Sequence, residues 1–324
     1  QRQHKSGPVE DEIQRAAHIF RVRLPLDRYD ADYVSYQIGS PYGKAYFLAH
    51  AKKTTGIASI NQRVLGAFPL ASPPINVQRQ IAARLKSQLA EVDAARQAAQ
   101  AQVRDADLLR QRLLRQAFDG LHEVPVKTLG DHAHVTSGVT PSRSNTAYWQ
   151  PAEVPWVKTG EIDFSPIKEV RESISRKALA ECSLSLLPPK TVLVAITGEG
   201  KTRGRSAVLE VTAATNQHAV AILPNDVWEA SFMQLWLQSS YHDLRELSDG
   251  RGGSRSALSG AQIKALEIPA PSHDQQRSIV NHLKAQLIEA DSIRQAAATQ
   301  LAEIERLPQR LLAQAFGSQQ GASP

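Results

Sequence analysis

The chain contains two long stretches in which apolar residues recur at steps of three and four. The first stripe comprises Ile81, Leu85, Leu89, Val92, Ala95, Ala99, Val103, Ala106, Leu109, Leu113 and Ala117. The second comprises Ile279, Leu283, Leu287, Ala290, Ile293, Ala297, Leu301, Ile304, Leu307, Leu311 and Ala315. A spacing that averages about 3.6 residues places each stripe along one face of a helix. The pattern predicts two long amphipathic helices, in residues 76–120 and 271–318.

The two stretches are copies of each other, related by a shift of 198 positions. The shift superimposes Gln78-Arg79 on Gln276-Arg277, Arg112-Leu113-Leu114 on Arg310-Leu311-Leu312, and Gln116-Ala117-Phe118 on Gln314-Ala315-Phe316. Both polar and apolar positions match without a gap. Such an internal repeat indicates two equivalent structural units, which suits the reading of two sites on one linear polymer.

Each predicted helix needs a partner for its apolar stripe. About 40 residues at 1.5 Å each make a rod of about 60 Å, which is too long for one small domain to cover. We therefore expect the helices to cover each other as a two-helix coiled coil. The residues expected to carry helix packing or partner contacts are Leu85, Leu89, Val92, Leu113, Leu283, Leu287, Ile293 and Leu311. Pro308 stands where the first copy has Arg110, so a kink or an early end is expected there.

Residues 121–270 have short apolar runs broken by Gly, Pro, Ser and Asn, a texture typical of an α+β or mostly β domain. The runs predict strands in residues 154–157, 191–196, 207–211 and 218–223, and a helix in residues 228–247. Trp149 and Trp156 are expected to belong to the core. Ahead of the first helix, the pattern predicts a strand around residues 18–24 and helical structure in residues 29–50.

The net charge of +6 and the pI near 9.4 favour a polyanionic partner. Residues 126–270 nevertheless balance, with 15 Lys and Arg against 15 Asp and Glu. Any contact between this segment and DNA must therefore come from local clusters of basic residues.

Two Gly-rich loops provide such clusters, in residues 198–205 and 250–256. Residues 195–202 approach the nucleotide-binding loop pattern, but Ala195 replaces its first glycine and strand-like sequence follows where a helix is required. We therefore reject ATP binding. Arginine can pair bidentately with guanine and glycine permits close approach, so these loops are better suited to DNA.

The sequence offers no catalytic constellation. His132 and His134 lack a third metal ligand nearby, and Cys182 is the single cysteine. We find no Gly-x-Ser-x-Gly motif and no cofactor motif of a methyltransferase or nuclease. No apolar run is long enough to span a bilayer, and the first residues lack a signal peptide, so a cytoplasmic protein without membrane partners is expected.

Several short motifs, in order, resemble the specificity subunits of Type I restriction-modification systems. They are Gly138-Val-Thr140-Pro141-Ser142, Asn145, Tyr148-Trp149, residues 154–162, Val192-Leu193-Val194, Asn216-Gln217, residues 256–269 and Gln275-Gln276-Arg277. The resemblance covers nearly the whole chain. Each motif alone is modest, but their order beside the helix repeat is specific.

The resemblance implies an α+β fold, in which mixed target-recognition domains are joined by two long antiparallel helices that form a coiled-coil spacer. Each recognition domain would read half of a bipartite site in double-stranded DNA. The residues expected to contact DNA are Thr140, Ser142, Lys158, Thr159, Lys201, Arg203, Arg205, Arg251, Ser254 and Arg255. The helices would dock modification (methyltransferase) subunits. Those partners would bring S-adenosylmethionine, and a restriction subunit would use ATP and Mg²⁺, so this chain would need no cofactor.

In one respect the chain departs from the family pattern. The shift of 198 places Gln1 opposite Glu199, so the first recognition domain lacks the counterpart of residues 121–198. The expected organisation is a domain remnant in residues 1–75, a helix in 76–120, a recognition domain in 121–270, a helix in 271–318 and a flexible tail in 319–324. One alternative is an assembly or decoy protein that binds modification subunits without reading DNA. Another is an enzyme fused to such a domain, which the lack of catalytic motifs disfavours.

Overall fold

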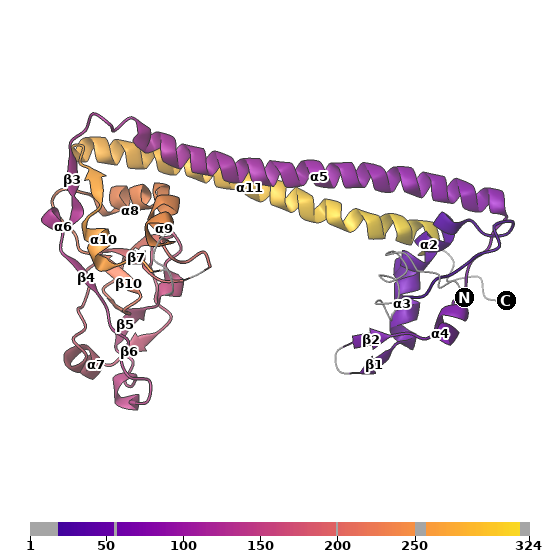
Figure 1. Ribbon diagram of the computed structural model, residues 1–324, viewed down its shortest axis with the longest axis horizontal. Coiled ribbons are helices and arrows are strands. Elements are labelled where there is room, and N and C mark those ends of the chain that lie inside the picture. Colours follow the sequence, from indigo (N-terminus) through magenta and orange to yellow (C-terminus); the bar gives the residue numbers. More distant parts are fainter. Residues whose placement is uncertain (1–18, 55–56, 199, 250–256, 318–324) are drawn as a thin grey trace, which may run out of the picture. The chain divides into compact units, whose positions relative to one another are not determined.

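The computed structural model describes residues 19–54, 57–198, 200–249 and 257–317 (Figure 1). The chain divides into two compact units, which are considered separately below. Unit 1 comprises Gln1–Val103 and Gln295–Pro324, and unit 2 comprises Arg104–Arg294. Within the described residues, no helix is both long and apolar enough to cross a membrane.

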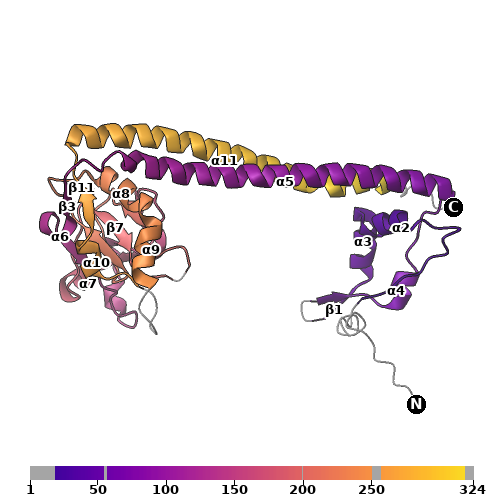
Figure 2. The ribbon, with the colours of Figure 1, turned by 45° about the horizontal axis from the view of Figure 1, so that its top comes forward.

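Two long helices contribute to both units. Helix α5 spans Ile75–Asp119 with 45 residues, and α11 spans His273–Phe316 with 44 residues, which confirms the two predicted helices. In each unit they lie side by side and run in opposite directions (Figures 1 and 2). One part of each helix belongs to unit 1 and the other part to unit 2, so the boundary between the units crosses both helices.

Helix α11 does not end at Pro308, so the expected early end is wrong. Proline removes one backbone hydrogen bond and crowds the preceding turn. Beyond it, however, Leu312 and Phe316 are buried in a cluster with Tyr33 and Leu85. Burial of these two large side chains stabilises the last turns by more than one lost hydrogen bond costs.

The apolar stripes are buried only in part. Leu85, Leu283 and Leu287 are buried, and Leu89, Val92, Leu113 and Leu311 are half-buried. Ile293 is 49% exposed, so of its two expected roles, helix packing or partner contact, its exposure favours the contact with a partner. A straight α-helix has 3.6 residues per turn, so its apolar stripe rotates slowly about the helix axis relative to the contact line with the other helix. Over many turns, this rotation exposes some positions of the stripe.

Besides its parts of the two long helices, unit 2 contains three sheets and five α-helices among its described residues. The four-stranded antiparallel sheet has the order β4 (Val135–Ser137), β10 (Ala219–Ile222), β7 (Val192–Ala195), β8 (Ser206–Val208). The three-stranded sheet has the order β6 (Ser173–Ile174), β5 (Val154–Val157), β9 (Ala214–Thr215), and β11 (Glu267–Pro269) pairs with β3 (Val126–Thr128). The helices are α6 (Leu129–His132), α7 (Arg176–Glu181), α8 (Ala230–Ser239), α9 (Tyr241–Asp249) and α10 (Gly260–Lys264), with short 3-10 turns at Thr146–Tyr148 and Thr159–Glu161.

These elements confirm most of the strands expected in unit 2. Strands lie at 154–157, 192–195 and 219–222, and the strand expected at 207–211 is shorter, at 206–208. The single helix expected at 228–247 is instead two helices that are interrupted at Ser240. Trp156 is 2% exposed, which confirms it as a core residue.

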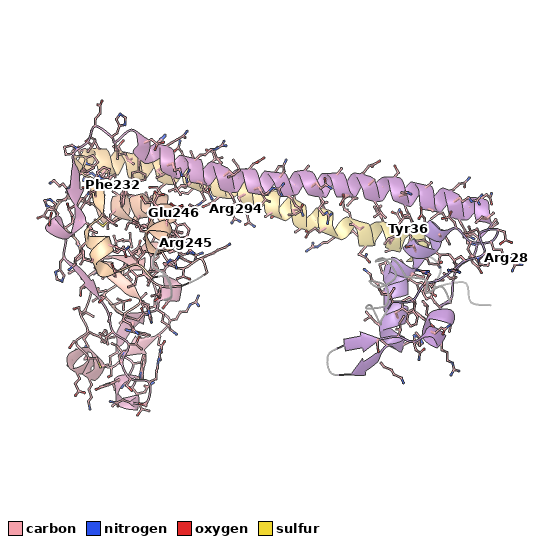
Figure 3. The ribbon with its side chains drawn as sticks, in the orientation of Figure 1. Arg28, Tyr36, Phe232, Arg245, Glu246 and Arg294 are labelled. Carbon is pink, nitrogen blue, oxygen red and sulfur yellow. The ribbon has the colours of Figure 1, made fainter. Side chains whose placement is uncertain are left out.

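The core of unit 2 lies between the four-stranded sheet, α8 and the long helices. Helix α8 packs on β7 and β8 and buries Phe232 and Leu235. Leu114 of α5 and Leu283 of α11 belong to the same apolar cluster. Figure 3 shows Phe232 on α8 close beneath the helix pair, where its ring lies 5.6 Å from that of Phe118. The recognition domain and its half of the helices therefore share one core.

Unit 1 is smaller. Its elements, besides the long helices, are α2 (Ala31–Gly39), α3 (Pro41–His50), a hairpin of β1 (Lys52–Thr54) and β2 (Ile57–Ser59), and α4 (Gln62–Gly66). Residues 19–24 form no regular element, so the strand expected around residues 18–24 is wrong for the residues described. A strand needs a neighbour for its backbone groups, and in the described part of unit 1 the only paired strands are β1 and β2.

In unit 2, a buried glutamine links the start of α11 to the start of α8. The side chain of Gln276 is fully buried and accepts a hydrogen bond from the backbone N–H of Glu229, at 2.8 Å. Its amide group donates to the carbonyl oxygens of Val227 and Pro271, at 2.7 and 2.9 Å. All three bonds reach backbone groups beside the first turns of α8 and α11, so one side chain fixes the angle between these helices.

The same arrangement recurs at the start of α5 in unit 1. Gln78, the repeat counterpart of Gln276, is also fully buried and accepts from the backbone N–H of Asp30, at 3.1 Å. Its amide donates to the carbonyl oxygens of Arg28 and Pro73, at 2.9 and 2.8 Å. The repeat in the sequence is therefore a repeat of contacts between a long helix and the helix packed on it.

Candidate nucleic-acid interface

The predicted DNA-binding loops of unit 2 leave the four-stranded sheet at one edge. Ser137 at the end of β4 pairs with Val220, and Ala195 at the end of β7 pairs with Ala219 at the start of β10. Val194 pairs with Ser206, the first residue of β8. Antiparallel pairing thus places the chain after β4 and β7, and before β8 and β10, at the same edge.

Two further segments join this edge. The hydroxyl of Thr159, just after β5, donates to Asn216, just before β10, at 2.9 Å. The N–H of Leu258 donates to the carbonyl of Ile196, at 2.9 Å, so Leu258 also lies at this edge. We call residues 138–142, 158–159, 198–205 and 216–218 the loop edge.

Gly138 allows the loop edge to form. A Cβ atom on this residue would lie 1.8 Å from the carbonyl oxygen of Thr215. The N–H of the next residue, Val139, donates a hydrogen bond to the same oxygen at 3.1 Å. Any side chain at position 138 would push β4 away from residues 215–216. The glycine of the motif at 138–142 is therefore required by close backbone packing.

The structure brings four of the predicted DNA-binding residues together here. Ser142 and Lys158 are exposed, whereas Thr140 and Thr159 are half-buried. The hydroxyl of Thr140 donates to Gln217, which ties the loop after β4 to the chain before β10. Exposed polar side chains on mutually bonded loops form a preorganised surface of hydrogen-bonding groups.

Arg143 and Glu172, which the sequence reasoning missed, organise this surface. The Arg143 guanidinium forms an ion pair with Glu172 and lies 3.6 Å from the ring centroid of Trp149. Lys158 pairs with the same carboxylate at 2.6 Å. The hydrogen bond from Arg143, reinforced by Lys158, lowers the pKa of Glu172 to about 2. Glu172 therefore stays ionised and holds two cations at the loop edge.

Arg143 and Glu172 differ in how well the sequence alone could have identified them. Arg143 directly follows Ser142 in the quoted motif and could have been found as its neighbour. Glu172 lies 29 positions from Arg143, and only the pairing of β6 with β5 brings it close. Trp149, half-buried, donates its indole N–H to the carbonyl of Ser142 at 3.0 Å. It supports the loop, as well as the guanidinium above it.

The loop at 198–205 presents its basic residues unequally. Lys201 is exposed, Arg205 is half-buried with its guanidinium 5.9 Å from the ring of Phe164, and Arg203 is only 2% exposed. The buried Arg203 does not reach the surface, which contradicts its expected role as a DNA contact. Its position follows from the tight turn at Gly204, whose φ of 86° folds the loop back.

Helix α9 holds this loop in place. The Tyr241 hydroxyl donates to the carbonyl of Lys201 at 2.8 Å, and Arg245 donates to the carbonyl of Arg203 at 3.2 Å. Strand β8 follows the loop, as expected, where a nucleotide-binding loop would continue into a helix. Arg251, Ser254 and Arg255 lie outside the described residues. Among the residues described, no three His, Cys, Asp or Glu side chains form a group that could hold a metal ion.

The chain belongs to the family of Type I restriction modification DNA specificity domains. The model of that family matches residues 122–305, which is more than half of the chain. The match includes the whole loop edge and the start of α11. DNA recognition within restriction-modification systems is therefore the family's function, and target recognition is the role of its members.

Curated relatives agree with this family. The Escherichia coli EcoR124I/EcoR124II specificity subunit is 24% identical over 162 residues, which cover 50% of this chain and 40% of that protein. The MjaIX specificity subunit of Methanocaldococcus jannaschii is 30% identical over 162 residues, covering 49% of this chain and 36% of that protein. The aligned segment thus spans well under half the length of either relative.

Solved structures extend the similarity of fold to most of the chain. A structure from work on complex assembly and conformational transition of the type I R-M system has a TM-score of 0.73 at 20% identity, covering 91% of this chain and 73% of that one. The HsdS subunit of Thermoanaerobacter tengcongensis has a TM-score of 0.57 at 19% identity, covering 91% and 72%. These similarities confirm the predicted fold class of recognition domains joined by long helices.

Proposed function

We propose that unit 2 reads one part of a bipartite site in double-stranded DNA through its loop edge. The observation that carries the proposal is the convergence of separate loops, with exposed Ser142 and Lys158, at one edge of a sheet. Groups held by a rigid sheet and by bonds between loops can present a fixed pattern of donors to base edges. The preorganised guanidinium of Arg143 is the strongest candidate for reading a guanine.

The long helices, on this proposal, dock the modification subunits and a restriction subunit. In unit 2 the helix pair exposes the large apolar residues Leu108, Leu109, Ile288 and Ile293. Arg110 pairs with Asp291 at 3.3 Å, so these exposed residues lie on neighbouring turns of the two helices. Exposed apolar residues gathered in this way are typical of a protein interface. The partners would supply S-adenosylmethionine, ATP and Mg²⁺, and this chain would supply the choice of sequence.

The experiment that tests the proposal is selection of random duplex DNA by the full chain, co-purified with its modification subunit. Enrichment of one short half-site that depends on the partner is the expected result. A stable complex that enriches no sequence would overturn the reading function. Leu109→Asp together with Ile293→Asp should abolish co-purification. Arg112→Asp is the control, because it introduces a carboxylate on the same helix end at a position outside the four exposed apolar residues.

A further inference from the structure

Unit 2 has a basic cleft beside the loop edge, where the end of α5 meets the loop at 198–205 and helix α9. The cleft measures about 420 Å³. Its basic and aromatic lining residues include Arg110, Arg115, Lys201, Tyr241, His242 and Arg245. Figure 3 shows Arg245 on α9, below the helix pair. The cleft thus joins one of the proposed DNA-contacting loops to the helix.

The charges of the cleft favour an anion. Among the described residues, no Asp or Glu lines it. Arg110 is paired with Asp291, and Arg245 donates to the carbonyl of Arg203. Arg115 and Lys201 are exposed, and within the described part of the chain neither has an acidic partner. As far as the structure describes the chain, the mouth of the cleft therefore carries two cations without a paired carboxylate.

Comparison of the two helix copies distinguishes the residues that pack the helix ends from the arginines that line the cleft. Leu114 and Phe118 correspond to Leu312 and Phe316, so the packing positions at the ends of α5 and α11 are the same. Arg115 corresponds to Ala313, although its neighbours match. Arg110 likewise corresponds to Pro308. Since the other copy forms the same helix end without them, the two arginines are not required by the helix packing.

We propose that this cleft binds a phosphate of the DNA backbone, so that the end of α5 extends the DNA contact beyond the recognition domain. The inference rests on the proposed function, because Lys201 belongs to both the loop edge and the cleft. Arg115 and Lys201 would contact the phosphate, while Tyr241 and Arg245 hold the loop that carries Lys201. Such a contact fixes the position of the duplex and carries no sequence information.

The test is the salt dependence of DNA binding by the full chain in complex with its modification subunit. Arg115→Gln is compared with Arg112→Gln, which removes the same charge from an exposed residue on the same helix end, outside the lining of the cleft. For wild type and both variants, the affinity for a duplex is measured between about 50 and 200 mM salt. Loss of one phosphate contact should reduce the slope of log K against log salt concentration by about 0.9.

We expect the reduced slope for Arg115→Gln and for Lys201→Gln, and the wild-type slope for Arg112→Gln. The ratio of affinities for selected and unrelated duplexes should stay unchanged in Arg115→Gln. Equal slopes in Arg115→Gln and Arg112→Gln would overturn the inference. So would loss of modification-subunit binding in Arg115→Gln at an unchanged slope, since the cleft would then serve an acidic segment of that partner. Failure of the proposed function appears separately, as a wild-type complex with the modification subunit that selects no sequence.

Discussion

The two units attach to the long helices in the same way but differ in what they carry. In unit 2, α8 rests on a four-stranded sheet that ends in the loop edge. The described part of unit 1 contains, apart from helices, one two-stranded hairpin. Large apolar side chains of unit 1 remain at its surface, with Ile19 79% and Leu48 62% exposed.

This difference shows that attachment and recognition are separable properties. Gln78 and Gln276 make equivalent hydrogen bonds, although only one of them lies in a unit with the larger sheet. Tyr33 packs against Phe316 at 5.4 Å in the same manner as Phe232 packs against Phe118 at 5.6 Å. The repeated contacts belong to the helices and their first partner helix, and the surface proposed to read DNA is built on the sheet.

The largest effect is expected from a substitution that disrupts the packing of α11 against α2 in unit 1. Phe316 is 1% exposed in a small cluster, so Phe316→Ala should destabilise unit 1 by about 4 kcal/mol. Phe118 is half-buried beside a larger core, so Phe118→Ala should cost unit 2 less. Hydrogen exchange of the α2 and α8 amides measures each unit separately. Equal losses of protection in the two variants would contradict the comparison.

The next effect concerns the buried glutamines. Gln276→Ala leaves one backbone N–H and two carbonyl oxygens without their partner, which should destabilise unit 2 by about 3 kcal/mol. Gln78→Ala should cost unit 1 about the same, because its three bonds are equivalent. Denaturant unfolding followed by hydrogen exchange reports both values. A loss of stability in only one of the two variants would show that the equivalent hydrogen bonds contribute unequally to the stability of the two units.

The sequence predicts the helices better than the loop edge, for a physical reason. Helical periodicity is local, and the repeat presents it twice, so the observed bounds of α5 and α11 lie within about two residues of the expected ones. Errors arose where distant contacts decide. Residues 19–24 lack a partner strand among those described, and the chain continues helically past Pro308 because Phe316 is buried.

The candidate site was predictable in its segments but not in its geometry. Motif order and basic composition identified Thr140, Ser142 and Lys158, which the structure gathers at one edge. The same reasoning could not distinguish exposed Lys201 from buried Arg203, because the turn at residue 204 decides which of them faces inward. Glu172 had no local signal, since its partners are brought to it by strand pairing.

A smaller effect sharpens the assignment of recognition to unit 2. Arg143→Ala should reduce discrimination between the selected half-site and a variant by about 1–3 kcal/mol at fixed salt, if the guanidinium reads a base. Arg176→Ala removes an exposed arginine that also forms an ion pair, with Glu153, on the same unit and serves as the control. Competition binding with paired duplexes measures both ratios. Unchanged discrimination in Arg143→Ala would remove this residue from the reading surface.

The smallest effect is a dependence on pH confined to unit 2. The pKa of Glu172 lies at about 2, below its ordinary value of 4.5, so its ion pairs contribute stability above pH 4.5 that is lost as the pH falls towards 2. Arg143 and Lys158 are about half exposed, at 54% and 49%, so solvent screening limits this contribution to about 1 kcal/mol.

Glu172→Gln should remove that contribution, because its neutral amide cannot ionise. The variant should be slightly less stable than the wild type at pH 6, and the difference should vanish on acidification. Glu153→Gln breaks the more exposed ion pair with Arg176 and provides the matched control, with a smaller change. Hydrogen exchange of β5 and β6, compared with α2 of unit 1, follows the two units in one sample. An equal response of both units would mean that acid acts on the shared helices and not on the carboxylate that organises the loop edge.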